Sequence, residues 1–542
     1  MSGVPLESRP PFSAPKRSRA IAASLAVVAV IFILRIPNIV LPMGPDQGVY
    51  TTIAWGLQRG LDLYRDMFEQ KLPGIYLAYL AGFTIFGTGS HAIFLLDYFA
   101  GLATVAAVFG IGSRLQGRRF AALAAAITAF ATFPAARYAY GGFLERGITE
   151  SFIIPIAAVS IWCGVSGAVR GGAGWIVAAG TLIGVAAVFK QTALIYLVVL
   201  VAWTWLVMGP RNAVRFALIA TPATLVAPAL VLAWLASRGV VHDMWQSTVE
   251  FNLAYLAIGD QSPGVTLIRF AQEIFRRARR DEIWALGGLA AAIAVLSWRW
   301  RGTPAGRLGA LGVLWLAGAL VATLANGPRL FTTYFIPSLV PLSILIAWLF
   351  DQTLASPTLT RRRAGMVLAG LAVVLLVRSG SLRQATSATW DDTRRLFGRT
   401  SSQEYLQRFR SRGREAFNAA TNERLAAYVQ AHTTPDERVF VFGMTAGTYF
   451  SSRRLPASRY LWAYAAVTRM LPDPRFTAES LAAELARTSP RYIILQRSNG
   501  DSFSGWRASE AFEDPSLQAL ISKAYARETE LGDFVLFRKT EP

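Results

Sequence analysis

Two polar stretches follow the first long apolar segment of the chain, GPDQG at residues 44–48 and DMFEQKLPG at residues 66–74. The first contains Asp46 and the second contains Lys71. A carboxylate beside the outer end of a membrane span can act as a base, and a lysine close to it can bind a phosphate headgroup. We therefore predict that this part of the chain carries out chemistry on a lipid-linked substrate at a membrane surface.

The composition is typical of a membrane protein. Of the 542 residues, 53% are hydrophobic and only 16% are charged, whereas soluble domains contain roughly 25% charged residues. The net charge of +21 would suit a nucleic-acid-binding protein, but the arginines form short clusters between apolar runs rather than one basic face. We therefore attribute the positive charge to membrane topology and expect no nucleic acid among the partners.

Cysteine and histidine are scarce in this chain. The single cysteine, Cys163, lies inside an apolar run, so no disulfide can form within the chain. The three histidines, His91, His242 and His432, are scattered along the sequence, and no metal-binding spacing of histidine and cysteine is present. We expect no cofactor to be required, although carboxylates alone could still bind a divalent metal.

The chain contains about eleven apolar segments of the length that crosses a membrane, roughly 20 residues. They lie at residues 20–42, 91–114, 119–137, 151–169, 173–189, 192–208, 215–237, 283–300, 307–325, 334–351 and 364–379. The first is too long for a cleaved signal peptide, and Arg35 and Pro37 stand where a cleavage site would need small residues. The sequence therefore predicts a tail at residues 1–19 and a membrane domain at residues 20–379.

Short basic clusters predict the orientation of this domain. Every cluster falls on the same side of an alternating path through the spans: Lys16, Arg17 and Arg19; Arg114, Arg118 and Arg119; Arg170; Arg211 and Arg215; Arg299, Arg301 and Arg307; Arg361, Arg362 and Arg363. That side is expected to be cytoplasmic, which places the amino terminus inside the cell and residues 43–90, residues 238–282 and the carboxyl-terminal region outside. We expect a multi-pass protein of the inner (plasma) membrane.

Two outer segments are too short to span. Residues 267–278 have the apolar stripe of an amphipathic helix, which predicts a helix lying in the membrane interface. The arginines near its end, Arg276, Arg277, Arg279 and Arg280, either face lipid phosphates or form a solvated basic turn that Asp281 and Glu282 partly balance. Residues 74–86 are apolar over a short length, which favours an interfacial or re-entrant helix.

Beyond residue 380 the composition becomes that of a soluble domain. Residues 380–402 are rich in serine, threonine and arginine and are predicted to be a linker. In residues 403–542, helices are expected to open at residue 421 and over 477–487, and strands at 438–443, 491–495 and 533–537. Helices alternating with strands indicate a small α/β domain. Since it shows no catalytic motif, an accessory or acceptor-docking role is expected.

The order of these motifs resembles that of the GT-C superfamily of membrane glycosyltransferases, in particular the bacterial protein-mannosyltransferase and aminoarabinose-transferase-like enzymes. The resemblance rests on GPDQGVY at residues 44–50, LYRDMFEQKLPG at 63–74, GRR at 117–119, GVAAVFKQ at 184–191 and RLFTTYF at 329–335. It implies a polytopic α-helical membrane protein of about eleven spans with a carboxyl-terminal extracytoplasmic α/β domain. It also implies a polyprenyl-phosphate sugar as the donor.

By this resemblance Asp46 is the catalytic base. An acceptor hydroxyl has a pKa far above 7, so its attack on a sugar needs a carboxylate that removes the proton. Lys71 would bind the donor phosphate, and Glu69 or Asp66 would orient Lys71 or assist the base. The alternatives are that Asp46 is a turn residue, that Lys71 is an interfacial anchor, and that the two acids are ordinary surface residues.

Other polar residues near the spans are also candidates, because ionisable groups in a membrane are usually functional. Arg146, Lys190 and Arg329 are predicted to bind the donor phosphate, and Gln70, Asp66 and Tyr334 to contact substrate. Tyr334 could instead belong to an interfacial aromatic belt. Asp97 is expected to pair with Arg35 in a structural role.

These residues predict a glycosyltransferase that moves a hexose or pentose from a polyprenyl-phosphate carrier to a glycan, lipid or protein acceptor at the outer face. The alternatives are a transporter or flippase for a lipid-linked sugar, and a catalytically silent scaffold for the outer domain. Transporters usually have repeated halves and polar groups at the membrane midplane. The polar residues of this chain lie mainly in the outer loops instead.

Overall fold

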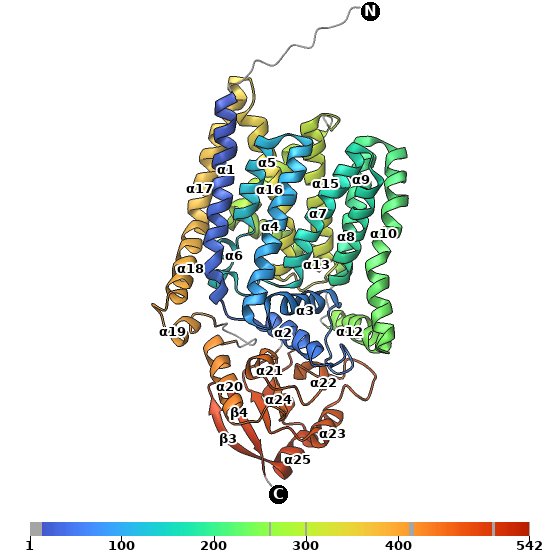
Figure 1. Ribbon diagram of the computed structural model, residues 1–542, viewed down its shortest axis with the longest axis vertical. Coiled ribbons are helices and arrows are strands. Elements are labelled where there is room, and N and C mark those ends of the chain that lie inside the picture. Colours follow the sequence, from blue (N-terminus) through green and yellow to red (C-terminus); the bar gives the residue numbers. More distant parts are fainter. Residues whose placement is uncertain (1–13, 259–261, 299–300, 411–416, 501–504, 541–542) are drawn as a thin grey trace, which may run out of the picture.

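The computed structural model describes residues 14–258, 262–298, 301–410, 417–500 and 505–540. It consists of a long helical bundle and a smaller domain with a four-stranded sheet, which lies at one end of the bundle (Figure 1). Residues 1–13 of the predicted tail, Arg299 of one basic cluster and the last two residues of the chain lie outside the described residues.

Each of the predicted spans contains a helix. The helices are α1 (Ala14–Arg35), α4 (Ser90–Leu115), α5 (Arg118–Ala131), α7 (Thr149–Arg170), α8 (Ala173–Phe189), α9 (Ile195–Met208), α10 (Pro210–Ser237), α14 (Glu282–Leu296), α15 (Pro304–Leu324), α16 (Leu339–Leu354) and α17 (Leu359–Ser379). Within the described residues, seven helices are long and apolar enough to cross a membrane, and a bent pair that includes α17 makes up to eight. Helices α8 and α14 are apolar but shorter. The chain is therefore a multi-pass membrane protein, and the figure of eleven spans stays a prediction.

Two helices lie between the bundle and the smaller domain, α2 (Pro45–Gln58) and α3 (Gly74–Phe86). Figure 1 shows α3 across the foot of the bundle rather than along it, as its short apolar run predicts. A Cβ atom on Gly74 would lie 2.8 Å from backbone atoms of Val188 and Phe189. Only glycine therefore lets α3 begin against the end of α8, and this contact brings the loop before α3 close to Lys190.

Helix α13 (Pro263–Arg280) corresponds to the predicted amphipathic segment. Its buried Glu273 forms ion pairs with Arg276 and Arg277, and the Arg277 guanidinium lies 4.1 Å from the centre of the Phe335 ring. Arg277 therefore binds protein groups rather than facing lipid. Asp281 and Glu282 do not balance this turn, because both accept hydrogen bonds from Arg137, which follows the span of α5.

Residues 381–396 of the predicted linker form helix α18 (Ser381–Leu396). The buried residues Ala385, Ala388, Thr389 and Asp392 are spaced as one face of a helix. Asp392 accepts hydrogen bonds from the Asn38 amide (2.9 Å) and the Tyr405 hydroxyl (2.7 Å). This segment is therefore a packed connection between the bundle and the smaller domain. Polar buried groups on its face explain why composition alone suggests a linker.

The smaller domain is an α/β unit that contains the three predicted strands. Its strands are β1 (Val439–Phe442), β2 (Tyr492–Gln496), β3 (Tyr525–Leu531) and β4 (Phe534–Lys539), in the order β1-β2-β4-β3. Strands β1 and β2 pair in parallel, whereas β2 with β4 and β3 with β4 are antiparallel. Strand β3, which the sequence analysis missed, is an edge strand with mostly exposed charged side chains.

Helices surround this sheet and connect it to the bundle. They are α19 (Ser402–Leu406), α20 (Ala419–Ala431), α21 (Gly447–Ser452), α22 (Ala463–Val467), α23 (Ala478–Thr488), α24 (Ala508–Phe512) and α25 (Pro515–Ala524). The remaining helices, α6 (Pro134–Arg137), α11 (Val241–Trp245) and α12 (Phe251–Ala257), lie in loops of the bundle. We call residues 403–540 the outer domain.

Candidate active site

Three charged residues from the two polar stretches meet at the foot of the bundle. The Lys71 Nζ atom lies 3.5 Å from Asp46 Oδ1 and 3.7 Å from Glu69 Oε1. The Glu69 residue is only 2% exposed, whereas the Asp46 side chain is 52% exposed. One ammonium group is therefore flanked by a buried carboxylate and by an open one that a substrate can reach.

Asp46 stands at the beginning of α2. Gly44 precedes the helix in an extended conformation, Pro45 opens it and Asp46 occupies the first turn. Proline suits the first helical position, and a negative charge in the first turn is stabilised by the helix dipole. The local sequence therefore explains the helix start, and it leaves the Asp46 carboxylate directed outward.

The pKa values of Glu69 and Lys71 are both raised, for different physical reasons. Burial raises the pKa of Glu69 above its usual range, although Lys71 opposes this shift. Burial disfavours the charged form of Lys71, but Asp46, Tyr50 and Glu69 outweigh it and raise the pKa of Lys71 well above its ordinary value. Lys71 is therefore a permanent cation over the whole physiological pH range.

A second charged group lies nearby, at the ends of α7 and α8. Lys190 Nζ lies 2.8 Å from Glu150 Oε1 and 4.1 Å from the centre of the Tyr334 ring. Arg329 packs over the ring of Tyr255, 3.3 Å from its centre. The charges of Lys71, Asp46, Glu150 and Arg329 all act on the Tyr334 hydroxyl. Of the predicted residues, Tyr334 thus lies within electrostatic reach of Asp46 and Lys71, whereas Lys190 contacts the Tyr334 ring and Arg329 contacts the Tyr255 ring.

Arg146 has a different place from the one predicted. Its buried guanidinium donates to the carbonyl oxygens of Asn38 (2.8 Å) and Leu41 (2.6 Å), so it holds the chain that leads into α2. The buried Gln47 amide donates to the carbonyls of Phe143 (2.8 Å) and Arg146 (2.7 Å). Arg146 therefore has a structural role, because it holds the backbone that leads to Asp46. This corrects its assignment to the donor phosphate.

Asp66 and Gln70 lie beside the site rather than in it. The Asp66 carboxylate accepts the backbone N–H of Asp62 (2.7 Å) and closes a local turn, and its contact with substrate stays a prediction. The backbone N–H of Gln70 donates to the Glu69 carboxylate (3.0 Å), and the backbone carbonyl of Gln70 accepts from the Asn252 side-chain amide (2.8 Å). Both residues therefore shape the loop that presents Glu69 and Lys71.

The predicted pair of Asp97 and Arg35 is not a direct ion pair among the described contacts. Asp97 accepts the backbone N–H of Gly147 (3.0 Å), and Arg35 donates to the Ala129 carbonyl (3.1 Å) and to the Thr132 hydroxyl (3.0 Å). Both groups instead fix backbone segments of neighbouring helices. Their role is structural, as expected, through different partners.

The outer domain forms one wall of the site. A Cβ atom on Gly48 would lie 2.8 Å from the Cα atom of Gly447, so α2 and α21 touch through two glycine backbones. Beside this contact is a cavity of about 830 Å³, lined by Gly44, Pro45 and Gly48 on one side and by residues of α20 and α21 on the other. The cavity is large enough for part of a substrate, and it is lined by Pro45, the residue before Asp46.

Among the residues that the structure describes, no group of three or more His, Cys, Asp or Glu side chains is placed to hold a metal ion. Asp46 and Glu69 are separated by Lys71, whose ammonium lies close to both carboxylates. The positive charge next to these two carboxylates is therefore the ammonium group of Lys71.

The partly buried Glu145 predicts a pH dependence of stability. Burial raises the pKa of Glu145 to about 7, from an ordinary 4.5. The folded protein therefore keeps a proton that the unfolded chain releases, and the stability due to this proton is lost as the pH rises towards 7. We expect the apparent melting temperature of the purified protein to fall by roughly 2–5 °C between about pH 5 and 8 for this reason. Scanning fluorimetry of Glu145→Gln should show a smaller fall, and an equal fall in the two proteins would contradict the assignment.

Comparison with known proteins agrees with this architecture. Residues 71–238 match the family described as dolichyl-phosphate-mannose-protein mannosyltransferase. ArnT from Cupriavidus metallidurans in the apo state is 16% identical, with a TM-score of 0.52 over 96% of this chain and 98% of ArnT. The structure of the same protein bound to undecaprenyl phosphate is also 16% identical, with a TM-score of 0.50 over 97% of this chain and 98% of ArnT.

A more distant protein has the same fold. The oligosaccharyltransferase of Archaeoglobus fulgidus in the apo form is 11% identical, with a TM-score of 0.53 over 98% of this chain and 75% of the archaeal chain. Among curated proteins, none matches the sequence. The resemblance that the motifs predict is thereby confirmed, and the chain has the fold of the GT-C membrane glycosyltransferases.

Proposed function

We propose that the protein is a glycosyltransferase that moves a hexose or pentose from a polyprenyl-phosphate carrier to an acceptor at the extracytoplasmic face of the plasma membrane. The observation that carries this proposal is the group of Asp46, Lys71 and Glu69, with distances of 3.5 and 3.7 Å, at the foot of a membrane bundle. The family match of residues 71–238 supports a lipid-phosphate sugar donor. The binding of undecaprenyl phosphate by ArnT supports the same class of carrier.

The proposed reaction is a single displacement. The acceptor hydroxyl oxygen attacks the anomeric carbon of the sugar while Asp46 removes the hydroxyl proton. The bond between the anomeric carbon and the phosphate oxygen breaks, and polyprenyl phosphate leaves with the electron pair. Lys71 stabilises the negative charge of the leaving phosphate. Glu69, buried beside Lys71, holds this ammonium in place.

The two sides of the site suit the two substrates. On the bundle side, Lys190, Arg329 and Tyr334 add cations and a ring near Lys71, which suits a sugar phosphate. On the outer-domain side, the cavity beside Gly44 and Pro45 suits an acceptor. Since Lys71 supplies the positive charge at the leaving group, no divalent metal is required in this proposal.

The transporter alternative has no support in the arrangement of charges. A transporter binds its substrate near the midplane, often at broken helices, whereas the charged groups described above lie at the end of the bundle that faces the outer domain. We therefore do not propose it as a second function.

A direct assay tests the proposed function. Purified protein in liposomes is supplied with radiolabelled polyprenyl-phosphate hexoses and pentoses, together with membrane extracts that contain acceptors. We expect label to move to an acceptor for one sugar class, with release of polyprenyl phosphate and with no loss when a chelator is added. Movement of intact donor across the bilayer without release of polyprenyl phosphate would show a flippase instead.

The orientation has its own test. The basic clusters predict that the end of the chain lies outside the cytoplasm, where the acceptor would be. Alkaline phosphatase fused after residue 542 should be active in cells, because this enzyme folds only outside the cytoplasm, and a β-galactosidase fusion at the same point should be inactive. The opposite pattern would reverse the orientation and remove the outer-face reaction.

A further inference from the structure

The outer domain holds the loop that carries Glu69 and Lys71. The residue before Glu69, Phe68, is fully buried, and its backbone N–H donates to the carbonyl of Arg459 in the outer domain (2.7 Å). Its ring contacts four aromatic rings, one from α12 and three from the outer domain: Phe251, Tyr460, Trp462 and Phe476. Phe68 is therefore an anchor that joins the loop of the site to the outer domain.

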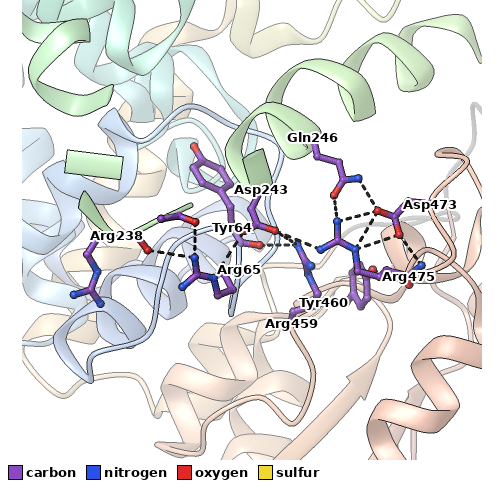
Figure 2. Close-up of polar contacts among 10 residues, drawn as sticks. Tyr64, Arg65, Arg238, Asp243, Gln246, Arg459, Tyr460, Asp473 and Arg475 are labelled. Carbon is purple, nitrogen blue, oxygen red and sulfur yellow. Dashed lines mark hydrogen bonds and ion pairs between the residues drawn. The ribbon is translucent and has the colours of Figure 1, made fainter. Parts of the chain in front are cut away.

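A single carboxylate, Asp243 in α11, lies at the centre of a group of arginines (Figure 2). Its oxygens lie 3.8 Å from Arg65, 3.8 Å from Arg459 and 3.4 Å from Arg475. Arg65 belongs to the loop before Phe68, whereas Arg459 and Arg475 belong to the outer domain. The Asp243 side chain is only 14% exposed, so solvent screens these attractions weakly.

Each arginine of this group is also tied to a second partner. Arg459 donates to the backbone carbonyl of Tyr64 (2.7 Å), and Arg475 pairs with Asp473 (2.8 Å), which in turn accepts from Gln246 (2.7 Å). On the other side of the group, Asp62 pairs with Arg65 (3.1 Å) and with Arg238 (2.5 Å). Figure 2 shows how Arg459, Asp473 and Arg475 of the outer domain contact Tyr64, Asp243 and Gln246, so that a network of polar contacts joins the two parts of the protein.

We propose that Asp243 is a positioning residue for the reaction. Through Arg65 and Arg459 it fixes residues 62–68, and through Phe68 it sets where Glu69 and Lys71 stand relative to Asp46. Without the Asp243 charge, three guanidinium groups lose their shared counter-ion and repel one another, which loosens the loop. This inference rests on the proposed function for its effect on sugar transfer, but its effect on the loop does not depend on that function.

The effect on rate follows from geometry. A displacement of about 1 Å at a reacting group can lower a rate roughly 100-fold. Asp243 itself forms its ion pairs with Arg65, Arg459 and Arg475 rather than with Lys71. In addition to docking an acceptor, the outer domain therefore orders the loop that carries Glu69 and Lys71.

The test compares Asp243→Asn with the parent protein as the full chain in lipid nanodiscs. Hydrogen exchange measured by mass spectrometry should become faster in residues 62–72 and stay unchanged in strands β1 and β2. In the transfer assay, kcat should fall roughly 10- to 100-fold. Asp243→Glu keeps the charge and should restore most of the protection and most of the rate. Asp436→Asn, at an exposed position between α20 and β1, is the matched control and should change neither.

Two results would overturn this inference. Parental hydrogen exchange over residues 62–72 in Asp243→Asn would show that the loop does not depend on Asp243. Faster exchange throughout β1 and β2 would show that Asp243 only stabilises the outer domain. A parent protein that transfers no sugar would remove the proposed function alone, because the exchange measurement still reports on the loop.

Discussion

Asp46→Asn is expected to lower the rate of sugar transfer by roughly 100- to 10,000-fold, the usual range for loss of a general base. Asparagine has the size of aspartate and suits the start of a helix, so α2 should form normally. The ion pair with Lys71 is also lost, but Asp46 is half-exposed and such pairs contribute little stability. The measurement is turnover at saturating donor and acceptor, with expression level and melting temperature as controls.

Glu69→Gln separates a single base from a two-carboxylate site. Glutamine can still accept the backbone N–H of Gln70, and it leaves the buried position filled. A modest loss would identify Asp46 as the sole base, whereas a loss equal to that of Asp46→Asn would indicate that both carboxylates share the proton. Full activity of Asp46→Asn at parental expression would disprove the proposed mechanism.

Lys71→Ala is expected to weaken use of the donor by roughly 10- to 150-fold, because a charged hydrogen bond to phosphate contributes about 1.5–3 kcal/mol. The loss should appear in kcat/KM for the donor. Lys71→Arg should recover part of it, since the charge is kept while the shape of the cation changes. Lys523→Ala, at an exposed position in α25, is a matched control for the loss of one positive charge.

The opposite result would assign Lys71 a different role. If both Lys71 variants bind and turn over donor like the parent, the lysine is an interfacial anchor whose partners Asp46 and Glu69 only fix its position. If only one of the two variants loses activity with the donor, the result would show that the fit of the cation to the phosphate matters.

The sequence predicts the elements of this fold well, because a membrane forces long apolar runs to be helices. Helix α3 has the predicted bounds, 74–86, and the run at 173–189 is helix α8. Asp46, Glu69 and Lys71 could be grouped from the sequence since they lie in neighbouring polar stretches after one span. Since few charged residues lie next to the membrane spans, such residues are easily recognised in the sequence.

Contacts between distant segments could not be predicted in this way. Asp243 and Arg459 lie far from Phe68 in the sequence. From the sequence alone, each is indistinguishable from an ordinary surface charge, because the contact between the outer domain and the loop is known only from the structure. Arg146 was misassigned because an arginine that binds backbone carbonyls and one that binds phosphate have the same sequence signature. The helix within the predicted linker could have been recognised, since residues 385, 388, 389 and 392 of α18 already have helical spacing.

The contact between Gly48 and Gly447 has a consequence for the order of events during synthesis. Gly447 leaves the ribosome about 400 residues after Gly48, an interval of roughly 20–80 s at typical rates of translation. Throughout that time the membrane helices are inserted while one wall of the cavity beside Asp46 is missing. The cavity next to Gly44 and Pro45 is therefore complete only after the outer domain has been made and has folded against α2.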